Sequence, residues 1–292
     1  MKRGIVAAGL GFFMAASSVA DVYAQVEVFA PGSLSVDGGE SWVSFDPSGE
    51  VAIFGRHGDG WSGHTFYLAR RTADGWSEPV MAPFSGAFGD RGARFTPDGR
   101  AVGFSSNRPL EGQTARSRRV YGLWTVAFHG WDERWGTPQP VPGVGSDAHE
   151  IHPSVAADGT IYFASSREGG LGRSDLYRAR PEGDTYLVEA LVGAINTEFS
   201  EADVFVDPAG RFIVFSRTDG PGGFGGDDLY IALKRGDGWS EPRNLGPDVN
   251  TSEYEYGPLV SPDGRTLLFT SHRNGAADLF EVPVADVGIP ER

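Results

Sequence analysis

The sequence contains five similar four-residue turns at nearly regular intervals, and this repetition restricts the fold more than any other feature. The turns span residues 46–49, 96–99, 156–159, 207–210 and 261–264, and each ends in glycine. Four carry proline in second position, where its fixed φ favours a tight turn, and the final glycine accepts a positive φ. The glycines follow one another at intervals of 50, 60, 51 and 54 residues. A repeat of this length, built on hairpin turns, is typical of β-propeller blades.

Each turn is followed by strand-like segments in the same order. The apolar segment directly after each turn ends in phenylalanine, at Phe54, Phe104, Phe163, Phe215 and Phe269. A third segment, rich in aromatic and apolar residues, follows it. In two repeats a fourth segment begins after Asp-Gly-Trp, where Asp-Gly favours a hairpin. Four antiparallel strands per repeat predict an all-β fold, a five-bladed β-propeller.

The two ends of the sequence complete the repeat count. We place the repeats near residues 40–85, 90–145, 150–195, 201–249 and 255–286, and the last of them has only three strands. Residues 26–34 parallel the fourth-strand segment that precedes the last repeat. We therefore predict that the N-terminal strand completes the last blade, closing residues 25–292 into one domain. The alternative is an open solenoid, which would leave bare sheet edges.

The first 24 residues have the pattern of a signal peptide. Lys2 and Arg3 precede an uncharged, mostly apolar run over residues 4–16, and small residues around Ala24 suit cleavage. The run is shorter than the roughly 20 residues that span a bilayer. We expect a periplasmic or secreted protein without a membrane span.

Charge and cysteine content narrow the classes of partner. Cleavage after Ala24 would remove two basic residues and one acidic residue, which takes the formal net charge from −14 to −15. Such an acidic chain is a poor candidate for binding nucleic acid. The absence of cysteine excludes disulfides and thiolate metal sites. We expect a monomer with no cofactor and no metal site, although a calcium or other divalent ion stays open.

The repeat resembles a known family at the level of its motifs. Segments such as GWSEPRNLGPDVNTSEYEYGPLVSPDGRTLLFTSHRNGAADLFEV and FSRTDGPGGFGGDDLYIA resemble the TolB-type, WD-like β-propeller repeat of exported bacterial proteins. The resemblance covers nearly all of the expected mature chain. Repeats one and two depart from it, with Thr65 and Gly122 where the others have aspartate before the third strand. The resemblance implies a propeller and does not imply a reaction.

Charged residues recur at two places in every repeat. Nine positions before each turn glycine stands an acid, at Glu40, Asp90, Glu150, Glu201 and Glu255, and these are the catalytic candidates if the protein is an enzyme. Each second strand is followed by arginine, at Arg56, Arg108, Arg167, Arg217 and Arg273. Both sets belong at one face of the ring. They form either a polar funnel for a ligand or a ring of structural ion pairs.

Further candidate ligand-binding residues lie at the same face. His149, His152 and His272 could contact a ligand, although a metal site would need more than the pair at 149 and 152, which is not the helical His-Glu-x-x-His motif. Two loops depart from the repeat, and such departures are where function is usually grafted. They carry Trp61, Arg116, Arg118 and Arg119, and a third, glycine-rich loop carries Phe224.

Two function classes remain from the sequence. The first is a non-catalytic propeller that presents the rim of acids and arginines to a glycan or to an envelope or exported protein. The second is a carbohydrate-active enzyme, a glycoside hydrolase or polysaccharide lyase, with carboxylates around the central funnel. The acids are periodic rather than specialised, which favours binding.

Overall fold

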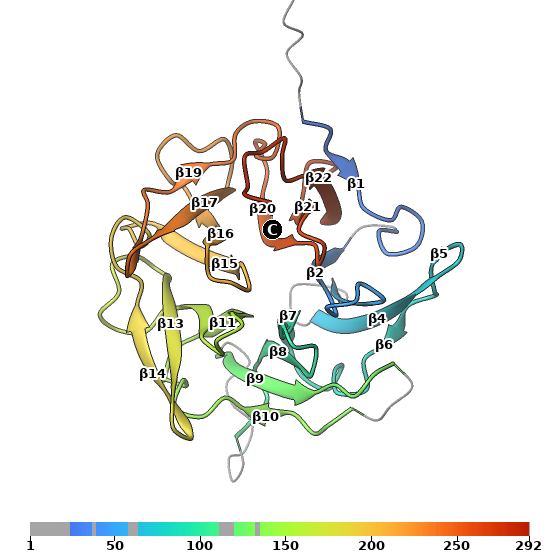
Figure 1. Ribbon diagram of the computed structural model, residues 1–292, viewed down its shortest axis with the longest axis horizontal. Coiled ribbons are helices and arrows are strands. Elements are labelled where there is room, and N and C mark those ends of the chain that lie inside the picture. Colours follow the sequence, from blue (N-terminus) through green and yellow to red (C-terminus); the bar gives the residue numbers. More distant parts are fainter. Residues whose placement is uncertain (1–23, 37–38, 58–63, 111–119, 132–134, 292) are drawn as a thin grey trace, which may run out of the picture.

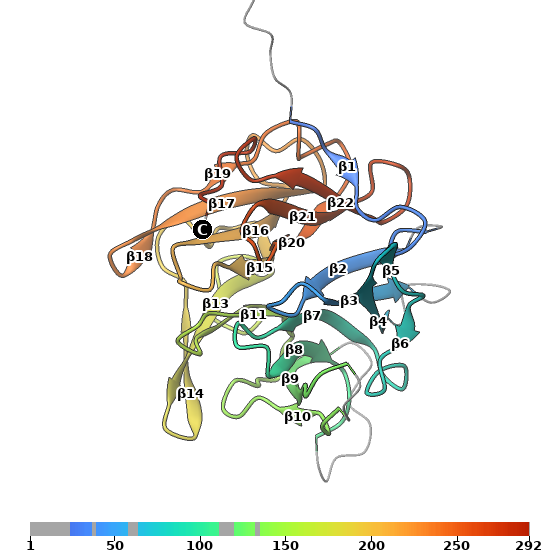
Figure 2. The same ribbon diagram turned by 45° about the vertical axis from the view of Figure 1, so that its right-hand side comes forward.

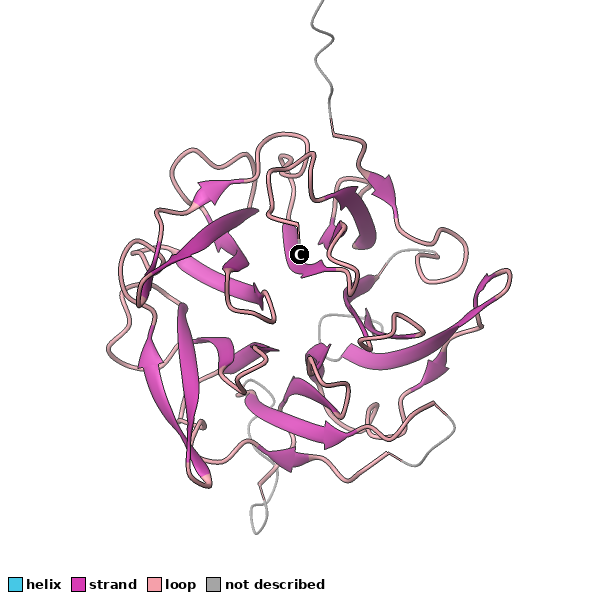
Figure 3. Cartoon of the chain, in the orientation of Figure 1, coloured by secondary structure: helices cyan, strands magenta, loops and turns pink. Residues whose placement is uncertain are grey.

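The computed structural model describes residues 24–36, 39–57, 64–110, 120–131 and 135–291. Five antiparallel sheets surround a central axis (Figure 1), and a view turned by 45° shows the same ring obliquely (Figure 2). All of the described regular structure is β-strand (Figure 3). The protein is therefore a five-bladed β-propeller, as the repeats predict. Of the expected signal peptide, only Ala24 is described.

In blades 1 to 4 the strands follow the sequence order from the axis outward, and in blade 5 the N-terminal β1 is the outermost strand. Blade 1 contains β2 (Glu40–Phe45), β3 (Val51–His57), β4 (His64–Thr72), β5 (Gly75–Trp76) and β6 (Val80–Met81). Blade 2 contains β7 (Asp90–Phe95), β8 (Ala101–Ser106), β9 (Gly122–Ala127) and β10 (Gln139–Pro140). Blade 3 contains β11 (Glu150–Val155), β12 (Ile161–Ser165), β13 (Asp175–Glu182) and β14 (Thr185–Ala190). Blade 4 contains β15 (Ser200–Val206), β16 (Phe212–Thr218), β17 (Asp227–Arg235), β18 (Gly238–Trp239) and β19 (Arg243–Asn244). Blade 5 contains β20 (Glu255–Val260), β21 (Thr266–Ser271), β22 (Asp278–Pro283) and β1 (Glu27–Val28).

The five predicted turns join the first and second strands of the blades. In each, the glycine N–H donates to the carbonyl oxygen three residues earlier, for example Gly210 to Asp207 at 2.7 Å. The glycine φ lies between 69° and 85° in all five turns, a conformation that favours glycine. We call this end of the ring the turn face. The opposite end, where the innermost strands begin, is the rim.

The outermost strands are short wherever the sequence contains proline. In blades 1 and 4 the fourth strand is split into two pieces, and Pro79 and Pro242 lie in the gaps. Proline has no N–H for the ladder and is tolerated mainly at sheet edges. Blade 3 has no proline in this segment, and its fourth strand, β14, runs for 6 residues.

The N-terminal strand closes the ring, as predicted. β1 pairs antiparallel with β22, with Glu27 opposite Glu281 and Val28 opposite Phe280. The Phe29 N–H continues the ladder by donating to the Leu279 carbonyl oxygen at 2.8 Å. In Figure 1, β1 lies at the outer edge of blade 5. The edge of β22 is thereby paired rather than exposed.

The core lies between neighbouring blades. In each second strand the phenylalanine at the end of the repeated apolar segment is completely buried: Phe54, Phe104, Phe163, Phe215 and Phe269. Within the described ranges there is no helix with the length and apolar character that crossing a bilayer requires.

Candidate functional site

Every periodic acid pairs with the arginine of its own blade. The acid is the first or second residue of the innermost strand, and the arginine is at or just beyond the end of the second strand. The N–O distances are 3.0 Å for Arg56–Glu40, 3.0 Å for Arg108–Asp90, 3.2 Å for Arg167–Glu150, 2.9 Å for Arg217–Glu201 and 3.9 Å for Arg273–Glu255. The structure thus brings both sets together as five repeated ion pairs at the rim.

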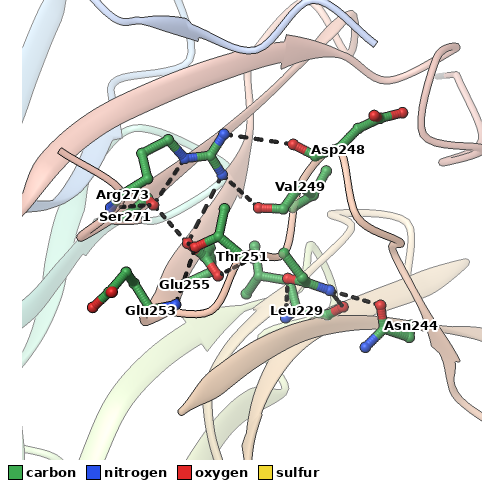
Figure 4. Close-up of polar contacts among 10 residues, drawn as sticks. Leu229, Asn244, Asp248, Val249, Thr251, Glu253, Glu255, Ser271 and Arg273 are labelled. Carbon is green, nitrogen blue, oxygen red and sulfur yellow. Dashed lines mark hydrogen bonds and ion pairs between the residues drawn. The ribbon is translucent and has the colours of Figure 1, made fainter. Parts of the chain in front are cut away.

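Blade 5 shows what surrounds such a pair (Figure 4). Glu255 accepts hydrogen bonds from the Thr251 N–H at 2.8 Å and from the Ser271 hydroxyl at 2.6 Å. Arg273 donates to the Val249 carbonyl oxygen, and its guanidinium stacks over the Phe280 ring, 4.8 Å from the centroid. Val249 and Thr251 belong to the segment that connects blade 4 to blade 5. The pair therefore ties the incoming linker to its own blade.

The acids are almost sealed from solvent. Their exposed fractions are 1% for Glu40 and 0% for Asp90, Glu150, Glu201 and Glu255. Burial raises the pKa of Glu40, Asp90 and Glu201, which means that the arginines and hydrogen bonds offset only part of the desolvation. Each of the five acids therefore has at least one oxygen already engaged by a protein donor.

Two residues after each acid the innermost strand is bulged, which the sequence did not predict. The register with the second strand shifts in all five blades, for example between Ser41 and Ser44. The residue at the bulge has a positive φ in every blade: Trp42 (53°), Gly92 (59°), His152 (55°), Asp203 (50°) and Gly257 (62°). A bulge re-aims the side chain that it carries.

Three of these bulge residues meet at the axis, and we call them the axial cluster. The His152 Nδ1 lies 3.0 Å from Asp203 Oδ1, and the Trp42 indole N–H donates to the same oxygen. The Trp42 and His152 rings lie 5.0 Å apart between centroids. Burial alone would raise the pKa of Asp203, but His152, the Trp42 hydrogen bond and Arg94 together hold it below its usual value.

The two glycines at the remaining bulges leave room for the cluster. A Cβ on Gly92 would lie 2.7 Å from the His152 ring, and one on Gly257 would lie 2.8 Å from the Trp42 ring. A non-glycine residue in the left-handed region costs of order 1–3 kcal/mol, and such residues gather at binding and catalytic sites. The axial cluster contains three.

At the rim end of the axis, Arg91 is a cation without a carboxylate partner among the described residues. Its guanidinium lies over the Tyr121 ring at 4.7 Å from the centroid, and its Nε is buried without a hydrogen bond to the described part of the chain. His149 Nδ1 accepts from the Tyr121 N–H at 3.2 Å. Burial, and then Arg91, lower the pKa of His149.

Five of the six histidines lie near this end of the ring or in the axial cluster: His57, His64, His149, His152 and His272. His57 and His64 are 3.2 Å apart between their Nε2 atoms. Burial, with His57, Arg91 and His152, lowers the pKa of His64 to about 2, so it is neutral at ordinary pH. The described residues contain no group of three or more His, Asp or Glu side chains arranged to hold a metal ion.

The structure separates the remaining sequence candidates. His152 joins the axial cluster, whereas the His272 ring lies beside Tyr256, with 3.4 Å from Nε2 to the hydroxyl. Phe224 is 46% exposed in its rim loop, where its N–H donates to Asp228 at 2.8 Å. Trp61, Arg116, Arg118 and Arg119 lie outside the described residues.

Sequence reasoning missed Trp42, Asp203, Arg91 and Tyr121. An alignment of the five innermost strands could have found two of them. At the position after the acid, Arg91 replaces the uncharged residues of the other blades, and at the next position Asp203 is the only acid.

No family model matches the sequence, and no curated protein sequence matches it. Its structure is similar to α-L-arabinofuranosidase from Lactobacillus brevis, with 11% identity and a TM-score of 0.52 over 84% of this chain and 90% of that one. Hydrazine synthase of Kuenenia stuttgartiensis is 14% identical in sequence, with a TM-score of 0.51 over 82% of this chain and 36% of that one. TolB from Acinetobacter baumannii is 14% identical in sequence, with a TM-score of 0.49 over 84% of this chain and 54% of TolB. The chain therefore spans about half the length of TolB. Identities this low show the fold alone, and that fold is a β-propeller.

Proposed function

We propose that this protein is an exported, non-catalytic propeller that binds a partner with an acidic group, a glycan or an envelope protein, at the rim. The observation that carries the proposal is Arg91. It stands beside the axis, its charge is not compensated by any described carboxylate, and Tyr121 supports its guanidinium from below. A planar guanidinium with free donors suits a carboxylate or sulfate group.

The surroundings of Arg91 support recognition rather than mere packing. The side chains around it include those of His57 and His149, which are partly exposed, and those of Tyr121 and Tyr256, which are buried. Such mixed surfaces suit sugar rings and protein side chains. The sequence repeat predicts that Trp61, Arg116, Arg118 and Arg119 lie at the same face, and we propose them as further contacts.

The alternative is a glycoside hydrolase or polysaccharide lyase. Glycoside hydrolysis needs two carboxylates that reach the substrate, one of them as an acid. All five periodic acids are buried and bonded to arginine, which argues against them in that role. We also propose cleavage of the leader after Ala24, delivery to the periplasm or the medium, and a monomeric state.

A glycan array probed with residues 25–292 tests this proposal, with uronic-acid and sulfated glycans beside neutral ones. We expect binding to acidic glycans that weakens as salt rises, and loss of that binding in Arg91→Met. Arg100→Met, which removes an exposed arginine next to a turn glycine, is the matched control and should bind as the parent does.

A reducing-sugar assay on the same glycans separates the two functions. Sugar release by the unmodified protein would overturn the non-catalytic proposal. Equal binding by the parent and Arg91→Met would overturn the role of Arg91.

A further inference from the structure

The turn face has its own cavity on the axis, on the side opposite to Arg91. Its volume is about 200 Å³. The wall includes the residues four positions after the acids of all five blades: Ser44, Arg94, Ser154, Phe205 and Leu259. Because each innermost strand contributes at the same level, the cavity lies on the axis rather than between two blades.

The polar side chains of the wall are those of Arg94, Ser44, Ser154 and Thr96, and the rest of the wall is apolar. Phe45, Phe95 and three valines form the next level of the wall, and four turn prolines surround its opening. In four blades the wall position held by Arg94 carries serine, phenylalanine or leucine. The repeat therefore does not require an arginine there.

Arg94 is a buried cation whose charge is only partly balanced, by Asp203 of the axial cluster. Its side chain is 5% exposed, and no described carboxylate lies within ion-pair distance. One guanidinium nitrogen, Nη2, donates to the Pro258 carbonyl oxygen, and Nη1 has no hydrogen-bond partner among the described residues. Burial lowers the pKa of Arg94 to about 10, which leaves it charged at neutral pH. A buried charge that is only partly compensated is costly, so a cavity beside one is suited to an anion.

We propose that this cavity binds a small monocarboxylate with an apolar body, its carboxylate against Arg94. A planar carboxylate matches the guanidinium fork, and a single cation between apolar walls favours a single negative charge. At roughly 30 Å³ per water, the volume equals about seven water molecules, which suits a body of one ring or a short alkyl chain.

A neighbouring groove between blades 2 and 3 gives the apolar body room to extend. Its volume is about 440 Å³, and it shares Thr96, Pro97 and Val155 with the axial cavity. Trp124 and Tyr186 line its far part. Blade 3 is also the blade whose turn has alanine instead of proline in second position.

Benzoate binding to residues 25–292 tests the inference, with benzamide as the neutral molecule of the same shape. Calorimetry and thermal melting should detect saturable benzoate binding and a higher melting temperature, and benzamide should do neither at the same concentration. Arg94→Met should weaken benzoate binding about tenfold or more, the loss expected for a charge-assisted hydrogen bond. Arg211→Met is the control, because Arg211 is next to a turn glycine on the same face and pairs with Asp207 at 2.9 Å.

If Arg94→Met does not fold, Arg94→Lys replaces it. Lysine keeps the positive charge but lacks the two parallel N–H donors of the guanidinium group. Benzoate should therefore bind to Arg94→Lys more weakly than to the parent, but still more tightly than benzamide does. Equal binding of benzoate and benzamide, undiminished binding by Arg94→Met, or no binding of acetate, hexanoate and benzoate would each overturn the inference.

Discussion

The backbone conformation of single residues decides what the centre of this ring can hold. Trp42, His152 and Asp203 have φ values of 50–55°, which glycine adopts far more readily. Their side chains are 6–7% exposed and hold one another at the axis. At the bulge glycines, Gly92 and Gly257, a side chain has no room, because the rings of His152 and Trp42 already fill that space.

Replacing Gly92 by alanine tests this division of space. We expect Gly92→Ala to lower the free energy of unfolding by about 3 kcal/mol, from the left-handed φ and from the clash with His152. Gly210→Ala is the matched control, because its φ is 69° and a Cβ there would meet nothing within 4 Å. It should cost only about 1 kcal/mol. Equal losses in urea denaturation would contradict the packing role of Gly92.

Asp227 at the rim should make stability depend on pH. Burial, with the nearby charges of Asp203, Asp219 and Asp228, raises the pKa of Asp227 to about 6, against about 3.9 in an unfolded chain. The folded state therefore keeps Asp227 protonated up to a higher pH than the unfolded chain does. The free energy of unfolding falls as the pH rises from about 4 to about 6, where folded Asp227 loses its proton. We expect Asp227→Asn to flatten that decline and to raise the free energy of unfolding at pH 7.5 by about 1–2 kcal/mol. Urea denaturation at pH 4.5 and 7.5 measures both effects, and an asparagine variant that is less stable at pH 7.5 would count against them.

Single-residue roles were the hardest to predict from the sequence. The bulge position carries tryptophan, glycine, histidine, aspartate and glycine in the five blades, so no residue type signals it. His152 was a candidate ligand-binding residue because His149 and Glu150 lie close to it in the sequence. In the structure it contacts Trp42 and Asp203, and these contacts join three blades. Contacts across blades depend on the ring closing, which the pattern along one strand cannot encode.

At the scale of elements, each blade is held to the linker before it by an acid and an arginine. Arg217 contacts Glu201 at 2.9 Å and donates to the carbonyl oxygens of Ala194 and Ile195 in the linker from blade 3. Both residue types recur in every blade, with the acid always nine positions before the turn glycine and the arginine 16–18 positions after the acid, which is why the sequence could predict the pairs. The sequence could not rank the structural and the functional interpretation, because that choice depends on burial.

Loss of one such pair should destabilise the fold. Glu201→Gln keeps an acceptor for Thr197 but removes the charge that faces Arg217. We expect the free energy of unfolding to fall by about 1–3 kcal/mol. Glu189→Gln is the control, because Glu189 pairs with Arg178 and Arg180 at the surface, where ion pairs contribute little. An unchanged melting temperature in Glu201→Gln would show that the periodic acids are not structural.

At the scale of the whole molecule, the ring depends on pairing its first strand with its last. The sequence predicted this from the missing fourth strand of the last repeat, and β1 pairs with β22 accordingly. The cross-strand neighbours Glu27 and Glu281 are both acidic, and burial together with Glu27 raises the pKa of Glu281. Their pairing therefore comes from the backbone ladder and from the packing of Phe29 against Phe45, 5.8 Å apart between centroids.

A disulfide across this closure tests the account most directly, since the chain has no cysteine of its own. Opposite residues of an antiparallel pair lie about 5.5 Å apart or less between Cα atoms, which a disulfide can bridge. The variant is Glu27→Cys with Glu281→Cys, and Glu27→Cys with Glu189→Cys in blade 3 is its control. The account predicts that oxidation removes both thiols of the first variant within one chain and raises the free energy of unfolding by about 2–4 kcal/mol. In the control, oxidation is expected to link only separate chains into dimers. Thiols that stay free in the first variant, or disulfides that form only between chains there, would contradict a ring closed by its N-terminal strand.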